Sequence, residues 1–379
     1  MEKEATGKNK YFDYNLLAII VFLVCFGLVM LYSTSSYSAQ LKFGDSMYYF
    51  KRQGLISLAS LFVMFFVSKI DYHIYARWAK KVYWLSFILM ALVLTPLGVE
   101  AYGARRWIRL PFGQTMQPAE VTKIAIVIFI PLLVCKMGSK IKDMKVLGKI
   151  FIWGAGAAAG VFFLTDNLST AVIVMGMVCV MLFVAHPKTA PFVAIAGGTC
   201  VLVAIGVKLL DIAMETSTDF RLRRILVWLH PEQYSDEGGF QVMQGLYAIG
   251  SGGFFGKGLG NSAQKMIIPE VQNDMILSII CEELGVFGAI VLLTLFAMLL
   301  YRLMFIAKNA PDLYGALIVT GIFAHISIQV ILNVAVVLNL IPTTGITLPF
   351  VSYGGTSVLF LLIEMGLALG VSSRIQLDS

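Results

Sequence analysis

Long apolar runs separated by short polar stretches dominate this chain. A bilayer core about 30 Å thick is crossed by a helix of roughly 20 apolar residues. Ten runs reach or approach this length, at residues 14–33, 53–69, 82–98, 118–136, 147–164, 168–185, 189–209, 275–301, 313–338 and 348–371. The pattern therefore predicts an all-α polytopic membrane protein with about ten transmembrane helices.

The polar stretches predict how these runs are organised. Residues 1–12 form a polar tail, and the first run is too long and lacks the small-residue cleavage site of a signal peptide, so it is expected to stay as a helix. Residues 13–379 then form a single membrane domain. The fifth and sixth runs, separated only by residues 165–167, are expected to be tilted spans or a re-entrant pair. One large loop, about 210–274, separates the seventh and eighth runs.

Composition narrows the class of protein further. Hydrophobic residues make up 58% of the 379 residues and charged residues only 13%, which excludes an ordinary water-soluble domain. The basic residues are dispersed over the loops and do not gather on a soluble face, so no nucleic-acid partner is expected. The cysteines lie in or beside apolar runs without metal-ligand spacing and predict small core residues, not disulfides; they are Cys25, Cys135, Cys179, Cys200 and Cys281.

The distribution of lysine and arginine predicts the orientation. Ten spans place both termini on one side, and the loops of that side are rich in basic residues, which assigns the termini to the cytoplasm. The 210–274 loop then lies outside. The short 99–117 loop also lies outside, yet its GARRWIR stretch carries Arg105, Arg106 and Arg109. These arginines either anchor lipid headgroups beside Trp107 or bind an anion, since the guanidinium fork matches phosphate geometry.

Several ionisable or polar residues lie inside the predicted spans, where they are costly and often functional. Glu120 and Lys123 are spaced i, i+3 and predict either a structural pair or the lining of a substrate cavity. Polar positions at i, i+4 and i+8 of the ninth span favour a seam of hydrogen bonds between helices over a metal site, because one histidine and two amides are a poor ligand set. That seam consists of His325, Gln329 and Asn333; further carboxyl groups are Glu282, Glu283 and Glu364.

The segment from Gly250 to Ser278 is unlike the rest of the chain. It is glycine-rich and basic, with Lys257 and Lys265, and it ends in Pro269-Glu270 and Asn273-Asp274 just before an apolar helix. Asp274 is either a helix cap or a reactive carboxylate at the positive end of the helix dipole. The glycines indicate either mobility or close contact with a substrate.

These motifs together resemble the SEDS family (shape, elongation, division and sporulation). The resemblance rests on GARRWI and QPAEVTK, on FQVMQGLYAIGSGGFFGKGLGNSAQK followed by PE and ND, on EELGVFGA, and on LIPTTGITLPFVSYGGTS, and it spans nearly the whole chain. PTTGITLPFVSYGG and KNAPDLYG look closer to the cell-division member than to the elongation and sporulation members.

The resemblance implies a peptidoglycan glycosyltransferase that polymerises lipid II on the outer face of the bacterial cytoplasmic membrane. It also implies a class B penicillin-binding protein and other divisome membrane proteins as partners. Asp274 matches the family's essential carboxylate and is expected to be the general base for the acceptor hydroxyl, with pyrophosphate as leaving group. The candidate substrate-binding residues are Arg105, Arg106, Lys257, Lys265, Glu270, Glu120, Lys123 and Ser352.

The chemistry of this reaction places few demands on the protein. A positioned base contributes about 10²–10⁴-fold to a rate. A glycosidase needs a second carboxyl group to protonate its leaving group, whereas pyrophosphate is a stable leaving group that cations can hold. A divalent ion, Mg²⁺ or Mn²⁺, bound by phosphate and carboxylate oxygens would serve as well, and no organic cofactor is implied.

One motif departs from the family pattern. Many members carry P-D-x-G-T-A where the fifth and sixth spans meet, and here Asn167 takes the place of the aspartate with Asp166 beside it. Two other functions stay open: a lipid II flippase and a non-catalytic division scaffold. Transporters often contain internal repeats and a binding site near the midplane. The chain has no clear repeat, and its densest polar features lie at the outer face, which favours the enzyme.

Overall fold

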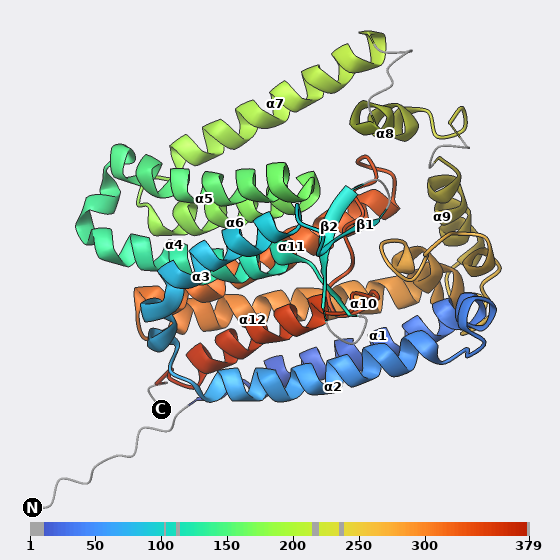
Figure 1. The fold of residues 1–379 in the computed structure, drawn as a ribbon, viewed down its shortest axis with the longest axis horizontal. Helices are drawn as coiled ribbons and strands as arrows, with labels where there is room; N and C mark the ends of the chain where they lie inside the picture. The colour runs from blue at the N-terminus through green and yellow to red at the C-terminus, as the bar shows by residue number, and fades with distance from the viewer. Residues whose placement is uncertain (1–10, 102–103, 111–113, 214–219, 235–238, 377–379) are drawn as a thin grey trace, which may run out of the picture.

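A computed structural model describes residues 11–101, 104–110, 114–213, 220–234 and 239–376. The fold is a bundle of long helices with a small sheet and two short helices at one end (Figure 1). Its first half contains α1 (Tyr14–Phe43), α2 (Tyr48–Lys69), α3 (Tyr72–Leu92), β1 (Gly98–Ala101), β2 (Ala104–Arg109), β3 (Thr115–Met116), α4 (Pro118–Met137), η2 (Gly138–Lys142), α5 (Met144–Thr165) and α6 (Leu168–Ala185). Its second half contains α7 (Ala190–Ala213), α8 (Phe220–Leu229), α9 (Gly239–Gly252), η4 (Gln264–Met266), α10 (Ile276–Asn309), α11 (Leu313–Val337) and α12 (Ser357–Ser372).

The prediction of an all-α polytopic membrane protein is confirmed. Within the described residues, seven helices are long and apolar enough to cross a membrane, namely Tyr14–Phe43, Tyr48–Lys69, Pro118–Lys142, Met144–Thr165, Leu168–Ala185, Ile276–Asn309 and Leu313–Val337. The fifth and sixth predicted runs are full-length helices, α5 and α6. The remaining three predicted runs correspond to α3, α7 and α12.

Two predicted runs include long stretches that are not helical. The run at 82–98 ends as a helix at Leu92, because the chain then turns into the three-stranded antiparallel sheet β1-β2-β3. The run at 348–371 becomes helical only at Ser357, because residues 338–356 follow an irregular path with positive φ at Asn339, Gly345 and Phe350. The loop predicted at 210–274 contains two helices, α8 and α9, and the short η4.

α11 lies at the centre of the bundle, where it packs against α4, α6, α10 and α12. It carries no Lys, Arg, Asp or Glu and buries residues on all sides, as expected of a helix surrounded by others. The predicted polar seam lies on it, but only His325 reaches another helix, through Glu364 of α12 at 2.6 Å. Gln329 and Asn333 instead hold the irregular 338–356 segment, through the carbonyls of Thr347 at 2.9 Å and Ile346 at 2.7 Å.

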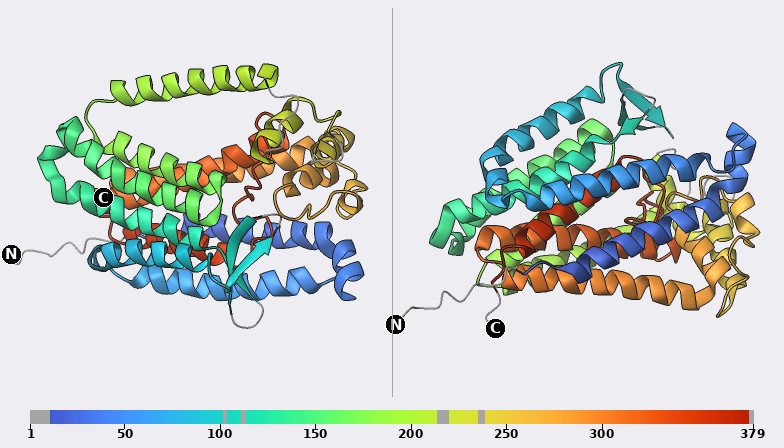
Figure 2. Two further views of the ribbon diagram at one scale, coloured as in Figure 1. Left: turned by 45° about the horizontal axis from the view of Figure 1, so that its top comes forward. Right: turned by 90° about the horizontal axis from the view of Figure 1, so that it is seen from below.

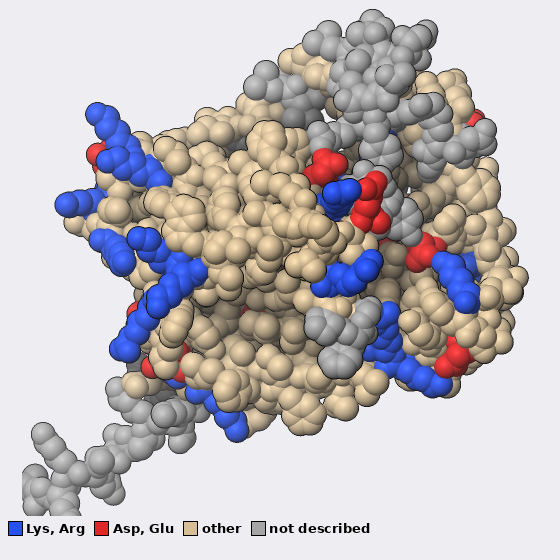
Figure 3. All heavy atoms as spheres, viewed as in Figure 1, with Lys and Arg blue, Asp and Glu red and all other residues tan. Residues whose placement is uncertain are grey.

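The two ends of the bundle have different characters. Residues 11 and 376, the first and last that the structure describes, lie at one end with the turn between α4 and α5, whereas α8, α9 and the sheet lie at the other, and α7 runs along the periphery (Figures 1 and 2). Lys and Arg side chains gather around the end that carries the termini, with a second group near the sheet (Figure 3). The two ends of the described chain lie at the same end of the bundle, which agrees with an even number of membrane crossings.

Candidate active site

Asp274 lies immediately before α10, at the end of the molecule that carries α8, α9 and the sheet. The residue that caps α10 is Met275, and no side chain accepts a hydrogen bond from the first turn of that helix. The alternative that Asp274 is a plain helix cap is therefore wrong. The residue as a whole is half-buried, and its carboxylate is left available for another role.

Two neighbouring elements hold the backbone at Asp274. Asn333, fully buried on α11, donates from Nδ2 to the Asp274 carbonyl at 2.9 Å and to the Ile346 carbonyl at 2.7 Å. Gly345, in the irregular segment after α11, has a φ of 69°, and a side-chain carbon there would meet Asp274 Oδ2 at 4.0 Å. The start of α10 and the 338–356 segment thus form one wall around the carboxylate.

Arg224 of α8 supplies positive charge next to this carboxylate. It donates from Nη1 to the Thr343 carbonyl at 3.3 Å and interacts electrostatically with Asp274. Trp228, one turn later on α8, donates from Nε1 to the Asn339 carbonyl at 2.9 Å. α8 therefore packs on the irregular segment after α11.

Arg106 approaches the same place from β2. It donates from Nη2 to the Asp166 carbonyl at 3.0 Å, and its charge is felt at Arg224. Asp166 ends α5 in a left-handed conformation with φ 48°, and its charge too acts on Arg224. Asn167, where the family aspartate is expected, caps α6 by accepting from the Thr170 amide at 3.0 Å.

The pKa values of Asp274 and Arg224 follow from this environment. Burial raises the pKa of Asp274 above the ordinary aspartate range; the charge of Arg224 and a long hydrogen bond of 3.5 Å from Gln241 Nε2 oppose this shift without cancelling it. Burial lowers the pKa of Arg224, and the like charge of Arg106 lowers it further. The site therefore holds a carboxylate with raised proton affinity beside two crowded guanidinium groups, an arrangement suited to a proton acceptor and an anionic group.

The other candidate residues are distributed around the molecule. Arg105 points to the face of β2 opposite Arg106 and pairs with Glu100 at 3.3 Å, and both are exposed. Glu270 pairs with Lys42 of α1 at 2.6 Å. Ser352 is buried, and its Oγ accepts from the Leu348 amide at 2.8 Å.

Three buried or half-buried ion pairs involve the remaining candidates. Glu120 and Lys123 pair with each other at 2.8 Å, nearly fully buried, which agrees with the structural alternative for this pair. Lys257 pairs with Glu282 at 2.7 Å and Lys265 with Glu283 at 3.1 Å. The structure thus brings Arg106 close to Arg224, which in turn acts on Asp274, and gives both lysines carboxylate partners.

Sequence reasoning missed Arg224 and Gln241. Arg224 was one of several basic residues in a loop whose fold had no signal beyond the amphipathic pattern of α8. Gln241 lies at the start of α9 and carries no charge to mark it. Only the fold brings α8 and α9 to the start of α10.

An apolar cavity of about 500 Å³ opens between α2 and α12 below the sheet. Its walls are Ile56, Ala59, Ser60 and Val63 of α2, Leu110 and Gln114 around the sheet, and Thr356 and Leu359 at the start of α12. Arg52 lies one turn before Ile56 on α2 and donates from Nη2 to Gln114 Oε1 at 3.0 Å. A guanidinium group therefore lies near an apolar space of a size suited to a lipid chain.

Comparisons with known proteins identify related chains over almost the full length. The family model described as cell cycle protein, which covers FtsW, RodA and SpoVE, matches residues 14–376. Stage V sporulation protein E of Bacillus subtilis is 38% identical over 97% of this chain and 98% of its own length. A probable peptidoglycan glycosyltransferase FtsW of Trichlorobacter lovleyi is 37% identical over 97% and 94%. Because these identities are nearly equal, the division branch stays a prediction.

Two solved structures share the fold. A chain from a peptidoglycan synthase complex that coordinates polymerization and crosslinking has a TM-score of 0.77 at 26% identity and covers 97% of this chain and 99% of its own. The rod shape determining protein RodA of Thermus thermophilus has a TM-score of 0.67 at 25% identity and covers 97% and 98%.

Proposed function

This chain belongs to the family of cell cycle proteins that includes FtsW, RodA and SpoVE, and we propose that it polymerises lipid II into glycan strands. It is then a peptidoglycan glycosyltransferase of the bacterial cytoplasmic membrane, with its termini in the cytoplasm and its active site outside. The observation that carries the proposal is Asp274, a half-buried residue whose carboxyl pKa is raised by burial and which lies beside Arg224. Relatives that match almost the whole length of this chain include probable peptidoglycan glycosyltransferases.

In the proposed reaction, Asp274 takes the proton of the acceptor sugar hydroxyl while the hydroxyl oxygen bonds to the anomeric carbon of the donor. The bond from that carbon to the lipid pyrophosphate breaks on the opposite face, so the configuration inverts. The pyrophosphate leaves with the electron pair and needs cations, not an acid. Arg106 and Arg224 lie where they can supply that charge. Lys257 and Lys265, first candidates for this role, are not among the charges that act on Asp274, whereas Arg224 is, so the proposal rests on Arg224 and its neighbour Arg106.

The lipid portion of the substrate needs an apolar site. The cavity between α2 and α12 meets this need, with Arg52 near one end for an anionic headgroup. We propose that it holds part of a polyprenyl chain. The proposed partner is a class B penicillin-binding protein, together with other divisome membrane proteins, because one structural neighbour comes from a complex that couples polymerization to crosslinking.

The function is tested with the protein purified together with its partner and placed in vesicles that contain lipid II. We expect glycan polymer to form, and we expect lipid II translocation to be no faster than in vesicles without the protein. The flippase alternative has one structural feature in its favour, the buried Glu120–Lys123 and His325–Glu364 pairs inside the bundle. Translocation without polymer would favour that alternative, and neither activity would favour a scaffold.

A divalent cation fits the site if the substrate supplies most of its ligands. Among the described residues no group of three or more His, Cys, Asp or Glu side chains lies close enough to hold a metal. Mg²⁺ commonly binds through one or two carboxylates together with substrate phosphates. Asp274 and Asp166 are the carboxylates near Arg224 that would hold a Mg²⁺ or Mn²⁺ ion alongside the pyrophosphate.

We therefore expect chelation with EDTA to lower the initial rate of polymerisation about tenfold or more, since a metal ion stabilises developing charge by several kcal/mol. Added Mg²⁺ or Mn²⁺ should restore the rate, and added Na⁺ at equal ionic strength should not. A rate that EDTA leaves unchanged would mean that the two arginines alone hold the leaving group.

A further inference from the structure

α10 is not one continuous helix. Gly285, with φ 69° and ψ −172°, interrupts it, so residues 276–284 form a separate first half that begins two residues after Asp274. Discontinuous helices are tolerated at membrane depth where other parts of the protein satisfy the freed backbone groups. In this protein the backbone of residues 252–258 does so.

The crossing segment is hydrogen-bonded to both halves of α10. Four backbone bonds of 2.9–3.0 Å join them: Lys257 N to Glu282 O, Gly258 N to Glu283 O, Val286 N to Gly253 O and Phe287 N to Phe254 O. The approach is so close that a side-chain carbon at Gly252, Gly256 or Gly285 would lie 2.0–2.3 Å from a facing carbonyl oxygen. Only glycine fits at these three positions.

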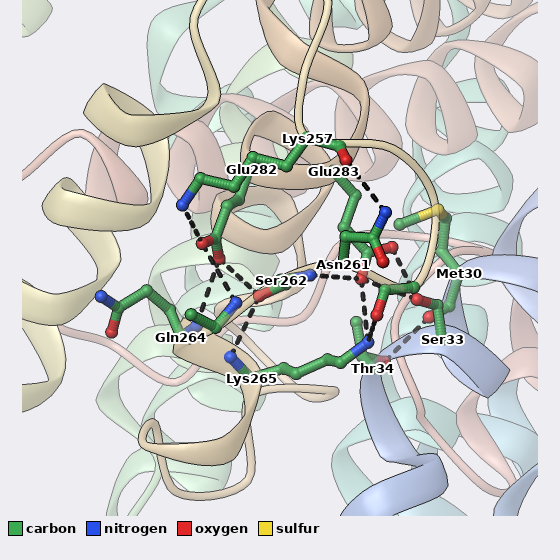
Figure 4. Close-up of polar contacts among 12 residues, drawn as sticks. Met30, Ser33, Thr34, Lys257, Asn261, Ser262, Gln264, Lys265, Glu282 and Glu283 are labelled. Carbon is green, nitrogen blue, oxygen red and sulfur yellow. Dashed lines mark hydrogen bonds and ion pairs between the residues drawn. The ribbon is translucent and has the colours of Figure 1, made fainter.

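Two fully buried carboxylates add side-chain contacts at the same place (Figure 4). Glu282 accepts hydrogen bonds from four donors of the 251–266 segment: Lys257 Nζ at 2.7 Å, Ser262 Oγ, Ala263 N at 3.2 Å and Gln264 N at 3.3 Å. The buried charge of Glu282 therefore has one cation and several hydrogen-bond donors around it, as burial of a carboxylate requires.

Glu283 joins a third element to the cluster. It accepts from Lys265 Nζ at 3.1 Å and from Ser33 Oγ of α1, 2.6 Å from its nearer oxygen. Lys265 is itself buried, and its amine also donates to the Gly260 carbonyl at 2.6 Å. The pair thus connects the loop, α1 and the first half of α10 (Figure 4).

The position of this pair relative to Asp274 is symmetrical in sequence. Lys265 lies nine residues before Asp274 and Glu283 nine residues after it. The ion pair therefore closes a loop of chain with Asp274 at its midpoint, and Ser33 of α1 donates a hydrogen bond to its Glu283 end. Asn333 holds the same midpoint from the α11 side.

We propose that Glu283 and Lys265 are positioning residues for the reaction, because their ion pair fixes the first half of α10 and thereby the direction in which the Asp274 carboxylate points. This inference rests on the proposed function of Asp274. Neither residue is among the contacts of Asp274, so they act through the helix and the loop. Misplacement of a reacting group by about 1 Å lowers a rate by up to about 10²-fold.

The test is a steady-state comparison of Glu283→Gln with the natural protein, each with its partner and with lipid II as substrate. We expect kcat to fall about tenfold to 10²-fold while KM changes less than about twofold, because substrate contacts remain. The acidic limb of the pH–rate profile should also move, since the surroundings of Asp274 change. Unchanged kcat and an unchanged pH profile would overturn the proposal.

A matched control lies at the other end of α10. Asp13 and Arg302 form a buried pair at 2.7 Å, with Asp13 fully buried. Asp13→Asn also removes one charge from a buried pair on this helix and should lower the thermal midpoint, yet kcat and the pH profile should stay within about twofold. A similar loss of kcat in both variants would mean that Glu283 acts only through stability.

A double variant keeps the test decisive if Glu283→Gln folds poorly. Lys265→Met with Glu283→Gln leaves no buried charge unpaired, so thermal stability should recover relative to the single variant. Positioning predicts that kcat stays low, whereas a merely structural role predicts that kcat recovers with stability. Asp274→Asn is measured in parallel: an active Asp274→Asn protein would refute the proposed base itself, independently of Glu283.

Discussion

Replacing Asp274 with asparagine is expected to lower the rate of glycan polymerisation about 10²–10⁴-fold, the usual contribution of a general base. Asparagine has nearly the same shape but cannot accept the hydroxyl proton. Lipid II translocation, measured separately, should not change. The matched control is Asp45→Asn, which changes an exposed aspartate that pairs with Lys51 and should leave polymerisation unchanged. Undiminished polymer synthesis by Asp274→Asn would contradict the assignment.

The pH profile provides an independent readout of the same residue. Burial raises the pKa of Asp274, so its carboxylate takes up a proton at a higher pH than an ordinary aspartate with a pKa of about 3.9. Because only the ionised form accepts a proton, the rate should fall as the pH drops through this raised pKa. The acidic midpoint of kcat should therefore lie clearly above 4. A midpoint at or below the ordinary aspartate value would mean that another group is the base.

The raised pKa of Asp274 also predicts how stability depends on pH: activity should rise with pH, whereas the free energy of unfolding should fall. A carboxyl group with a raised pKa in the folded state binds its proton more tightly there than in the unfolded chain. The free energy of unfolding then decreases as the pH rises from the unfolded to the folded pKa, and above the folded pKa the cost of the buried charge is fully present. Asp274→Asn removes this cost, so its thermal midpoint at pH 7 should equal or exceed that of the natural protein. Lost activity with undiminished stability separates catalysis from folding.

The second large effect is expected at Arg224. Arg224→Gln removes a guanidinium group near Asp274, and the rate should fall about 10²–10³-fold, as when a single group that stabilises transition-state charge is lost. Arg224→Lys should recover only part of the rate, since an ammonium group cannot make the planar paired contacts of a guanidinium with phosphate. Initial rates with lipid II measure both variants.

Two controls isolate the charge of Arg224. Arg109→Gln removes an exposed arginine from β2 and should leave the rate unchanged. Trp228→Phe removes the hydrogen bond from α8 to the Asn339 carbonyl without removing charge, so it reports how much the docking of α8 contributes. If Trp228→Phe lowers the rate as much as Arg224→Gln does, Arg224 acts by holding α8 and not through the leaving group.

The long apolar runs predicted α1, α2, α4, α5, α6, α10 and α11 because crossing a bilayer requires a minimum apolar length. The same argument failed where the run continued past the helix. Residues 93–98 are as apolar as the end of α3, but they turn into a sheet whose strands are too short to show a two-residue pattern. Residues 348–352 are buried but not helical, and they directly follow the carbonyls of Ile346 and Thr347 that Asn333 and Gln329 hold; buried irregular backbone has no periodicity.

The site could be predicted only in part for a similar reason. The resemblance singled out Asp274, and charge against the topological trend singled out Arg106. Lys257 and Lys265 looked like free cations in a flexible loop because nothing in the local pattern pairs them with Glu282 and Glu283. Those pairs depend on a backbone crossing at three glycines, and only the folded chain reveals that crossing.

The break at Gly285 also has a consequence for biogenesis. Two adjacent glutamates in an uninterrupted apolar helix would hinder its entry into the bilayer, since translocon scales assign up to about 3 kcal/mol to a charged residue at mid-helix. Lys257 and Lys265 precede Glu282 and Glu283 in the chain, so both lysines are synthesised before the glutamates that they neutralise in the fold. The order of synthesis therefore allows this segment to enter the membrane as a neutral unit, with the loop and the helix inserting together.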